Sequence, residues 1–348
     1  MQDTVNRITG QDAAARAKAH ARLEQLTMPH WALGRLMDLA EDLAGMTGSL
    51  RPAVERRAVV VMAGDHGVAL EGVSKSPREV TVQQVVNFVR GGAGINAMAR
   101  TTRARVVVVD MGIAPAVPAC VAQSVISERI GPGTANIANG PAMSRTDAIR
   151  SIKAGIRVAC ELDAETDVFG VGEMGIGNTT PSSAIVAALC GSSAEPVTGR
   201  GSGIDEATWR KKVAVVERAL EVNRPDPTDG LDVLARVGGF EIGGIAGLFI
   251  GAAALRKPVL VDGFITTAGA LIAQAIAPCS TDFMIAAHAS AEPGHRMALA
   301  KLGKRPLLDL GTRLGEGTGA ALAMNLVEAA ARLLTDVATF EEAQVSRV

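Results

Sequence analysis

Short runs of apolar residues recur along the chain, and they limit its possible folds more than any other feature. The runs are rich in Val and continuous rather than alternating, as is typical of strands buried on both faces. They cover residues 58–63, 105–110, 167–171, 258–262 and 283–288, and P-L-L-D-L at 306–310 is a final strand candidate. Helical patterns lie between them. This alternation predicts an α/β fold with a doubly wound parallel sheet.

The two ends of the chain are expected to be helical. Residues 11–47 carry helical patterns but have no strand of their own to cover, and a further helix is expected over 320–335. We therefore expect a small helical subdomain over residues 1–50, completed by about 320–348, beside an α/β domain over 51–319. The longest uncharged stretch, Ile242 to Leu255, is shorter than the roughly 18 residues of a membrane span. A buried, closely packed helix is the better interpretation of it.

The composition excludes several classes of function. A formal net charge of −1 gives no support for a nucleic-acid partner or an anionic membrane surface, and 3% aromatic residues disfavour a base-stacking platform. The four cysteines are scattered without a C-x-x-C pair, which favours reduced thiols in the core over a zinc site. The N-terminal segment is polar and lacks the apolar core of a signal peptide. We expect a cytoplasmic protein.

Polar residues that can take part in catalysis or ligand binding follow the predicted strands. The strand ends carry Asp65, His66, Asp110, Glu173, Asp262 and His288, and Glu316 follows the last candidate strand. Taken singly, such residues often cap a helix or fix a turn. Taken together they favour a site, because ligands of open parallel sheets bind beyond the carboxyl ends of the strands.

Three glycine-rich loops stand beside these residues, at 170–180, 199–203 and 315–319. Glycine allows backbone N–H groups to converge on an anion, so the loops indicate a phosphorylated ligand. The first contains G-x-G-x-x-G, but a dinucleotide is disfavoured since Glu173 would place a carboxylate beside the pyrophosphate. The following helix is also expected to begin late, near Thr179 to Pro181, with Thr as its cap, and the acid expected about 20 residues further on is absent.

Several longer motifs carry a resemblance to a known family. They are V-M-A-G-D-H-G-V at 61–68, S-P-R-E-V-T at 76–81, G-E-M-G-I-G-N-T-T at 172–180, L-V-D-G-F at 260–264, H-A-S-A-E-P-G at 288–294 and R-L-G-E-G-T-G-A-A at 313–321. The chain resembles the nicotinate-nucleotide–dimethylbenzimidazole phosphoribosyltransferases over almost its whole length. These enzymes make α-ribazole 5′-phosphate for cobalamin. M-P-H-W at 28–31 departs from the Pro/Gly/Ser turn that is usual in the family.

The resemblance implies a Rossmann-like sheet, a small helical domain and a homodimer. It implies nicotinate mononucleotide and 5,6-dimethylbenzimidazole as substrates, with no cofactor and no metal. Glu316 would be the catalytic base, with Glu173 and Lys212 as further functional residues. The benzimidazole pocket would include Ser76, Gln84 and Leu314. The nucleotide phosphate would be held by Gly175, Gly177, Asn178, Thr179, Thr180, Gly201, Ser202 and Gly203.

These residues suit the reaction. The pyridinium of the nucleotide leaves as a neutral ring, so no acid is needed. The benzimidazole attacks through one ring nitrogen and must lose the proton on its other ring nitrogen to a base. Attack opposite the leaving group inverts the anomeric carbon. An apolar pocket would raise the pKa of Glu316 and a helix N-terminus would lower it, and the sequence leaves this balance open. A non-catalytic binder and an NAD-dependent oxidoreductase are the alternatives.

Overall fold

The computed structural model describes residues 1–201 and 203–346. Its centre is a six-stranded, wholly parallel sheet with the order β3-β2-β1-β4-β5-β6. The strands are β1 (Arg57–Gly64), β2 (Arg105–Gly112), β3 (Val125–Ser127), β4 (Val168–Met174), β5 (Val259–Val261) and β6 (Met284–Ala286). The order runs outward in both directions from β1 and β4, as in a doubly wound fold. The predicted fold class is confirmed.

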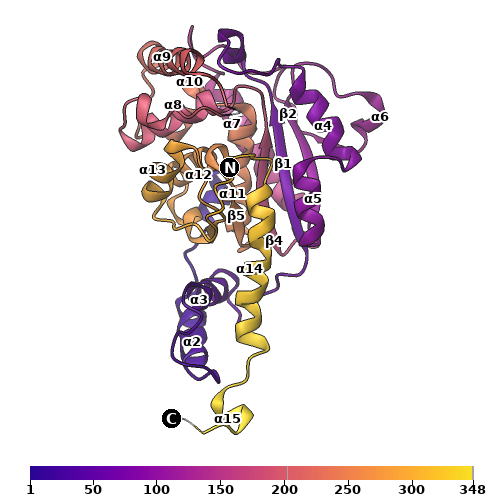
Figure 1. The fold of residues 1–348 in the computed structure, drawn as a ribbon, viewed down its shortest axis with the longest axis vertical. Helices are drawn as coiled ribbons and strands as arrows, with labels where there is room; N and C mark the ends of the chain where they lie inside the picture. The colour runs from indigo at the N-terminus through magenta and orange to yellow at the C-terminus, as the bar shows by residue number, and fades with distance from the viewer. Residues whose placement is uncertain (202, 347–348) are drawn as a thin grey trace.

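Helices cover both faces of this sheet (Figure 1). In chain order the helices are α1 (Gln2–Asn6), α2 (Ala13–Leu23), α3 (Arg35–Thr47), α4 (Val80–Arg90), α5 (Gly94–Thr101), α6 (Ala119–Ala122), α7 (Arg145–Glu161), α8 (Thr179–Cys190), α9 (Glu206–Asn223), α10 (Gly230–Val237), α11 (Phe240–Ala254), α12 (Phe264–Ile276), α13 (Pro293–Leu302), α14 (Thr318–Thr335) and α15 (Phe340–Ala343). Short 3₁₀ turns complete the connections. Among the described residues, no helix is both long and apolar enough to cross a membrane.

The pleat of β1 divides the apolar core into two layers. Val60 and Met62 pack with helices α7, α10, α11 and α12, while Val59 and Val61 pack with α3, α4, α5 and α14. Successive side chains point to opposite faces of a strand, so a continuous run of apolar residues serves both layers.

Helix α11 contains most of the long uncharged stretch, and all of its residues except Ala254 at its end are buried. It packs against α7 at very short range, since a Cβ on Gly155 would lie 1.9 Å from the carbonyl oxygen of Gly244. The prediction of a buried, closely packed helix is confirmed, and its glycines permit the close approach.

Helices α2 and α3 pack with the second half of α14, away from the sheet (Figure 1). The two chain ends are also tied by hydrogen bonds, since Arg22 Nε donates to the Leu334 carbonyl at 2.8 Å and the Thr27 N–H to the Ala338 carbonyl at 3.0 Å. These contacts agree with the expected helical arrangement. The domain boundary at residue 50 remains a prediction, because the same core layer continues from these helices to the sheet.

Some local predictions were wrong, among them the core position of the cysteines, since three of the four are exposed and one is half-buried. Residues 306–310 do not form a strand of the sheet: Leu308 makes only an isolated parallel bridge to His288. Pro306 lacks the N–H that a strand would donate. The edge strand β3 was not predicted, because three residues give little pattern. The 11–47 region is interrupted by a loop in which Trp31 adopts a φ of 50° and donates from its indole N–H to Asp38 at 2.7 Å.

Candidate active site

A cavity of about 690 Å³ opens beyond the carboxyl ends of β4, β5 and β6. It adjoins the point between β1 and β4 where the strand order reverses, which is where open parallel sheets bind their ligands. Most of the predicted site residues meet here. Those lining the cavity are Gln84, Glu173, Gly175, Gly177, Asn178, Thr179, Gly201, His288, Leu314 and Glu316.

Glu316 lies in the loop before α14 with a backbone φ of 62°, a left-handed value that is uncommon outside glycine. Gly315 and Gly317 also have positive φ, so the chain turns sharply and sets the carboxylate into the cavity wall. Its Oε2 accepts a hydrogen bond from the Ile95 N–H, in the first turn of α5, at 3.0 Å. Burial raises the pKa of Glu316 and prevails over this amide, and the charge of Asp262 adds to the increase. A carboxylate with a raised pKa is suited to act as a general base.

Glu173 stands beside this loop as the penultimate residue of β4. Its Oε2 accepts a hydrogen bond from the Asn178 side-chain amide, and a Cβ on Gly315 would lie 2.3 Å from its Oε1. Burial, followed by the charge of Asp262, raises the pKa of Glu173 to about 8. Glu173 therefore keeps its proton over most of the neutral range and is a poor proton acceptor there.

Asp262 directly follows β5 and fixes the loop that carries Glu316. Its carboxylate accepts hydrogen bonds from the Ala320 N–H at 2.8 Å and the Gly317 N–H at 3.3 Å, at the start of α14. His288 lines the cavity, with Nε2 3.8 Å from Asp262 Oδ1 and Nδ1 3.0 Å from the Thr312 hydroxyl. Burial raises the pKa of Asp262. In this structure Asp262 has the capping role that is common for acids at strand ends.

The G-x-G-x-x-G spacing has a packing explanation. Gly170 and Gly172 lie inside β4, where a Cβ would come 2.9 Å from Met324 of α14 and 2.2 Å from the Glu316 carbonyl oxygen. These glycines let α14 and the Glu316 loop approach the sheet. The third, Gly175, begins the turn to α8, which starts at Thr179 with Asn178 as its N-cap residue rather than a threonine. Asn178 has helical φ and ψ and its side chain turns to Glu173 instead.

Lys212 joins α9 to the beginning of α8 and to the 199–201 loop. Its Nζ donates to the Thr179 hydroxyl at 2.8 Å and to the Gly199 carbonyl at 3.1 Å. Burial lowers the pKa of Lys212 to about 8, and the charge of Glu292 opposes that decrease. A buried cation thus stands behind the wall formed by Thr179 and Gly201, where an anionic group could approach it.

The remaining predicted residues lie outside the cavity wall as the described residues define it. Asp65 accepts a hydrogen bond from the Ala114 N–H at 2.7 Å, and His66 Nε2 lies 2.6 Å from Glu241 Oε1. Ser76 is half-buried and its N–H donates to Ser74, which lines the cavity. Thr180 is buried in α8, Gly203 ends the neighbouring loop, and Ser202 lies outside the described residues.

Sequence reasoning missed three residues of the site. Ile95 supplies the amide to Glu316, while Glu292 and Arg313 line the cavity and hold the loop at Gly201. Both charged residues occur inside quoted motifs, but Glu before Pro293 has the pattern of an ordinary helix start. Among the described residues, no group of three or more His, Cys, Asp or Glu side chains is arranged to hold a metal ion.

Comparisons with known proteins agree with this geometry. A family model described as "Phosphoribosyltransferase" matches residues 8–345. Nicotinate-nucleotide–dimethylbenzimidazole phosphoribosyltransferase from Syntrophotalea carbinolica is 63% identical over 348 residues, which covers 100% of this chain and 99% of the relative. The protein of the same name from Desulfotalea psychrophila is 56% identical, with coverages of 99% and 97%.

A solved structure extends the likeness to three dimensions. The crystal structure of the enzyme of this name from Thermus thermophilus matches with a TM-score of 0.91 and 46% identity, covering 97% of this chain and 100% of the other. Sequence and fold thus agree over nearly the full length. The chain belongs to the phosphoribosyltransferase family whose members carry the name nicotinate-nucleotide–dimethylbenzimidazole phosphoribosyltransferase.

Proposed function

We propose that this protein transfers the phosphoribosyl group of nicotinate mononucleotide to 5,6-dimethylbenzimidazole, giving α-ribazole 5′-phosphate and nicotinate in cobalamin biosynthesis. The observation that carries the proposal is the pair of adjoining carboxylates, Glu316 and Glu173, in one cavity with raised pKa values. The family of the chain supports the choice of substrates.

In the proposed reaction one benzimidazole nitrogen attacks the anomeric carbon as the bond to the nicotinate ring breaks. The bonding electrons pass to the pyridinium nitrogen, which becomes neutral, and the other ring nitrogen of benzimidazole, which bears the N–H, gives its proton to Glu316. Because attack occurs opposite the leaving group, the anomeric configuration changes from β to α. Holding both reactants in line contributes to the rate without further chemistry from the protein.

Glu173 takes a different part in this proposal. With a pKa of about 8 it is mostly protonated at neutral pH, so it is a poor proton acceptor there. It can instead hydrogen-bond a ribose oxygen near the reacting carbon. The apolar wall near Gln84 and Leu314, which includes Met98 and Leu322, suits the benzimidazole, and the turn of Gly175 to Thr179 with Lys212 suits the phosphate.

The test is product formation. The protein is incubated with both substrates, the riboside phosphate is identified by mass spectrometry, and its anomeric configuration is determined by nuclear magnetic resonance. The α-anomer is expected. Binding of both substrates without product would favour a non-catalytic binder, and tight binding of NAD with hydride transfer would favour an oxidoreductase.

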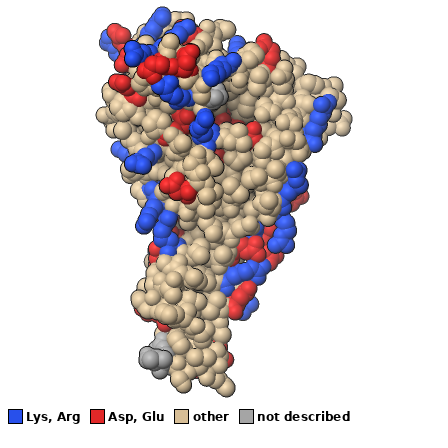
Figure 2. Space-filling view, viewed as in Figure 1, with Lys and Arg blue, Asp and Glu red and all other residues tan. Residues whose placement is uncertain are grey.

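The assembly we propose is a homodimer. The family resemblance implies it, and Figure 2 shows few charged side chains on the visible face of the α2–α3 region, in contrast to the upper part near α9 and α10. Leu33, which lies between α2 and α3, Leu70, in the 3₁₀ turn after β1, and Leu314, which lines the cavity, are exposed. The cytoplasmic location expected from the sequence stays a prediction.

A further inference from the structure

Glu292 does something other than what its place in the chain suggests. It is the N-cap residue of α13, where an acidic side chain commonly accepts a backbone hydrogen bond from its own helix, but it makes no such bond. Instead its Oε1 accepts a hydrogen bond from the Gly201 N–H at 3.0 Å, across 91 residues of sequence. The residue is 7% exposed and lines the cavity.

The second carboxylate oxygen of Glu292 also lies against this loop. A Cβ on Gly199 would come 1.8 Å from Oε2, so residue 199 has to be glycine for the carboxylate to occupy its position. Oε2 is buried and has no hydrogen-bond partner among the described residues. Burying a carboxylate in this way is unfavourable. The arrangement is therefore unlike a solvated surface contact.

Arg313 holds the other end of the same residue. Its guanidinium donates to the Gly201 carbonyl oxygen at 2.7 Å. The N–H of Gly201 is thus held by Glu292 at the start of α13, and its C=O is held by Arg313 from the loop of Glu316. Gly201 lies in a turn with a φ of 51°, outside any helix or strand, so these two hydrogen bonds fix its backbone.

The held loop forms one side of the region where a phosphate would bind. A Cβ on Gly201 would be 3.5 Å from the Thr179 hydroxyl and 3.8 Å from Lys212 Nζ. Lys212 itself donates to the carbonyl of Gly199. The position of the 199–201 loop therefore decides where the buried ammonium lies relative to the cavity.

The geometry points to Glu292 and Arg313 as positioning residues for the nucleotide: they hold the 199–201 loop in place before the phosphate arrives, so that Lys212 and Thr179 meet it. This rests on the proposed function. Because the Gly201 N–H already donates to Glu292, the phosphate is met here by the ammonium and the hydroxyl rather than by this amide. Preformed loops bind more tightly because less ordering accompanies binding.

The experiment compares Glu292→Ala with Glu292→Gln. The glutamine keeps an oxygen that accepts from the Gly201 N–H, whereas alanine removes it. For Glu292→Ala we expect the KM for nicotinate mononucleotide and the inhibition constant of inorganic phosphate to rise about tenfold, the usual effect of losing a hydrogen bond to a charged group. The KM for benzimidazole and the kcat at saturating nucleotide should change less than about twofold. Glu292→Gln should restore most of the nucleotide affinity.

Glu206→Ala is the matched control, because this acid pairs with Arg200 in the same region but does not contact Gly201. It should leave both KM values unchanged. Equal losses for both substrates in Glu292→Ala, or a glutamine variant no better than the alanine, would overturn the positioning role. A wild-type protein that makes no riboside phosphate would instead refute the proposed function, and direct binding of inorganic phosphate would still report on Glu292.

Discussion

At the scale of single residues, the candidate site depends on two glutamates in different environments. Both are buried and both meet the charge of Asp262, but Glu173 accepts a hydrogen bond from a side-chain amide and Glu316 accepts one from a backbone amide in the first turn of a helix. Burial raises the pKa of both carboxyl groups, and a pKa of about 8 leaves Glu173 mostly protonated at neutral pH, so we propose Glu316 as the base.

The first prediction concerns Glu316 as the base. Glu316→Gln keeps the size and hydrogen bonding of the side chain but removes its basicity, so kcat should fall by about 10²-fold or more. Steady-state kinetics at saturating substrates measures this. In the wild type, activity should decline as the pH falls through the pKa of Glu316, because the protonated form cannot accept a proton. That decline should occur above the usual range for glutamate, since the pKa is raised.

An N-methylated benzimidazole provides the control, because a methyl group replaces the N–H proton that Glu316 would accept. The difference between the wild type and Glu316→Gln should shrink with this substrate. A near-normal kcat for Glu316→Gln with dimethylbenzimidazole would move the role to Glu173 or to water.

The second prediction concerns how the buried Glu173 carboxyl makes the free energy of unfolding depend on pH. Its folded-state pKa of about 8 exceeds the usual 4.5, so its contribution to stability is fully present below pH 4.5 and is lost as the pH rises through 8. Glu173→Gln cannot ionise, so its free energy of unfolding should increase relative to that of the wild type as the pH rises from 4.5 to 8. At pH 9 the difference should be roughly 2 kcal/mol or more. Denaturant unfolding of both proteins at pH 5 and pH 9 measures the change. A difference that does not depend on pH would contradict it.

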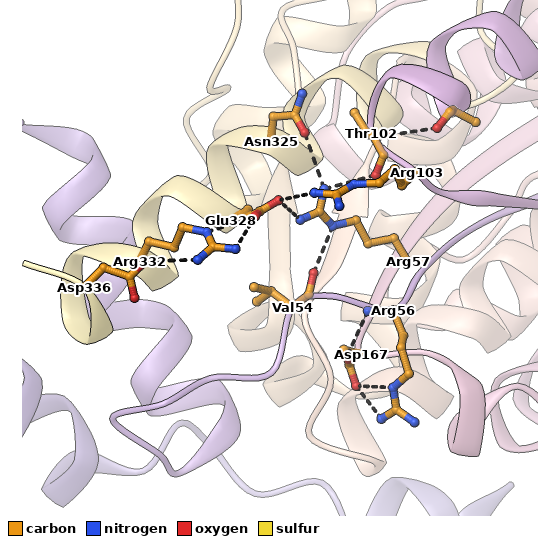
Figure 3. A network of polar contacts seen from close by, with 11 residues as sticks. Val54, Arg56, Arg57, Thr102, Arg103, Asp167, Asn325, Glu328, Arg332 and Asp336 are labelled. Atoms are coloured by element: carbon orange, nitrogen blue, oxygen red, sulfur yellow. Dashed lines mark hydrogen bonds and ion pairs between the residues drawn. The ribbon is translucent and has the colours of Figure 1, made fainter.

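At the scale of elements, α14 runs from the carboxyl ends of the strands, where the site lies, to their amino ends. It begins beside Glu316. Farther along the helix, Glu328 forms ion pairs with Arg57, at the start of β1, and with Arg332 (Figure 3). Arg57 is buried and also donates to the carbonyls of Val54 and Thr102. This network fastens α14 to the sheet far from the chemistry.

The third prediction follows from the burial of Arg57. Glu328→Gln should reduce the free energy of unfolding by about 2 kcal/mol, because it leaves a buried guanidinium without its countercharge. Thermal or denaturant unfolding measures this, and activity per folded molecule should stay the same. Arg103→Gln is the control: the Arg103 side chain is 83% exposed and 4.0 Å from Glu328, so its removal should change little. Equal effects of the two variants would show that burial does not decide the outcome.

The elements that could be predicted from the sequence are those with strong patterns. The continuous apolar runs of β1 and β4 and the uncharged run of α11 are almost wholly buried, and the run of β2 is buried over its second half, as their apolar composition predicts. Strand β3 has only three residues, and P-L-L-D-L has a strand composition without a place in the sheet. Such short segments take their structure from neighbours that are distant in sequence.

The candidate site was predictable to a similar degree. The strand-end rule and the motifs identify Glu173 and Glu316, and the structure brings them into one cavity. The rule does not distinguish Asp262, which fastens α14, from residues that face the cavity. Contacts such as the one between Glu292 and Gly201 join segments 91 residues apart, and no local sequence pattern predicts them.

At the scale of the whole molecule, the fourth prediction is a homodimer. Sedimentation equilibrium should give a mass near twice the 35.8 kDa of the chain, because the family resemblance implies a dimer and the α2–α3 region shows a face with few charges. Dilution to nanomolar concentrations tests whether activity follows assembly. A fully active species of 35.8 kDa at all concentrations would contradict the prediction.

The left-handed backbone of Glu316 has a consequence for chemical rescue. At a φ of 62° a glycine is unstrained, so Glu316→Gly should fold without backbone strain and leave a vacant space beside the Ile95 N–H. A small carboxylate ion could enter this space, bind the freed amide and accept the proton. We expect added acetate or propionate to restore part of the lost activity of Glu316→Gly, in a saturable manner, and to leave Glu316→Gln unaffected because its side chain still fills the space. Rates measured against acetate concentration, with chloride as the ionic-strength control, would decide this, and equal responses of the two variants would refute it.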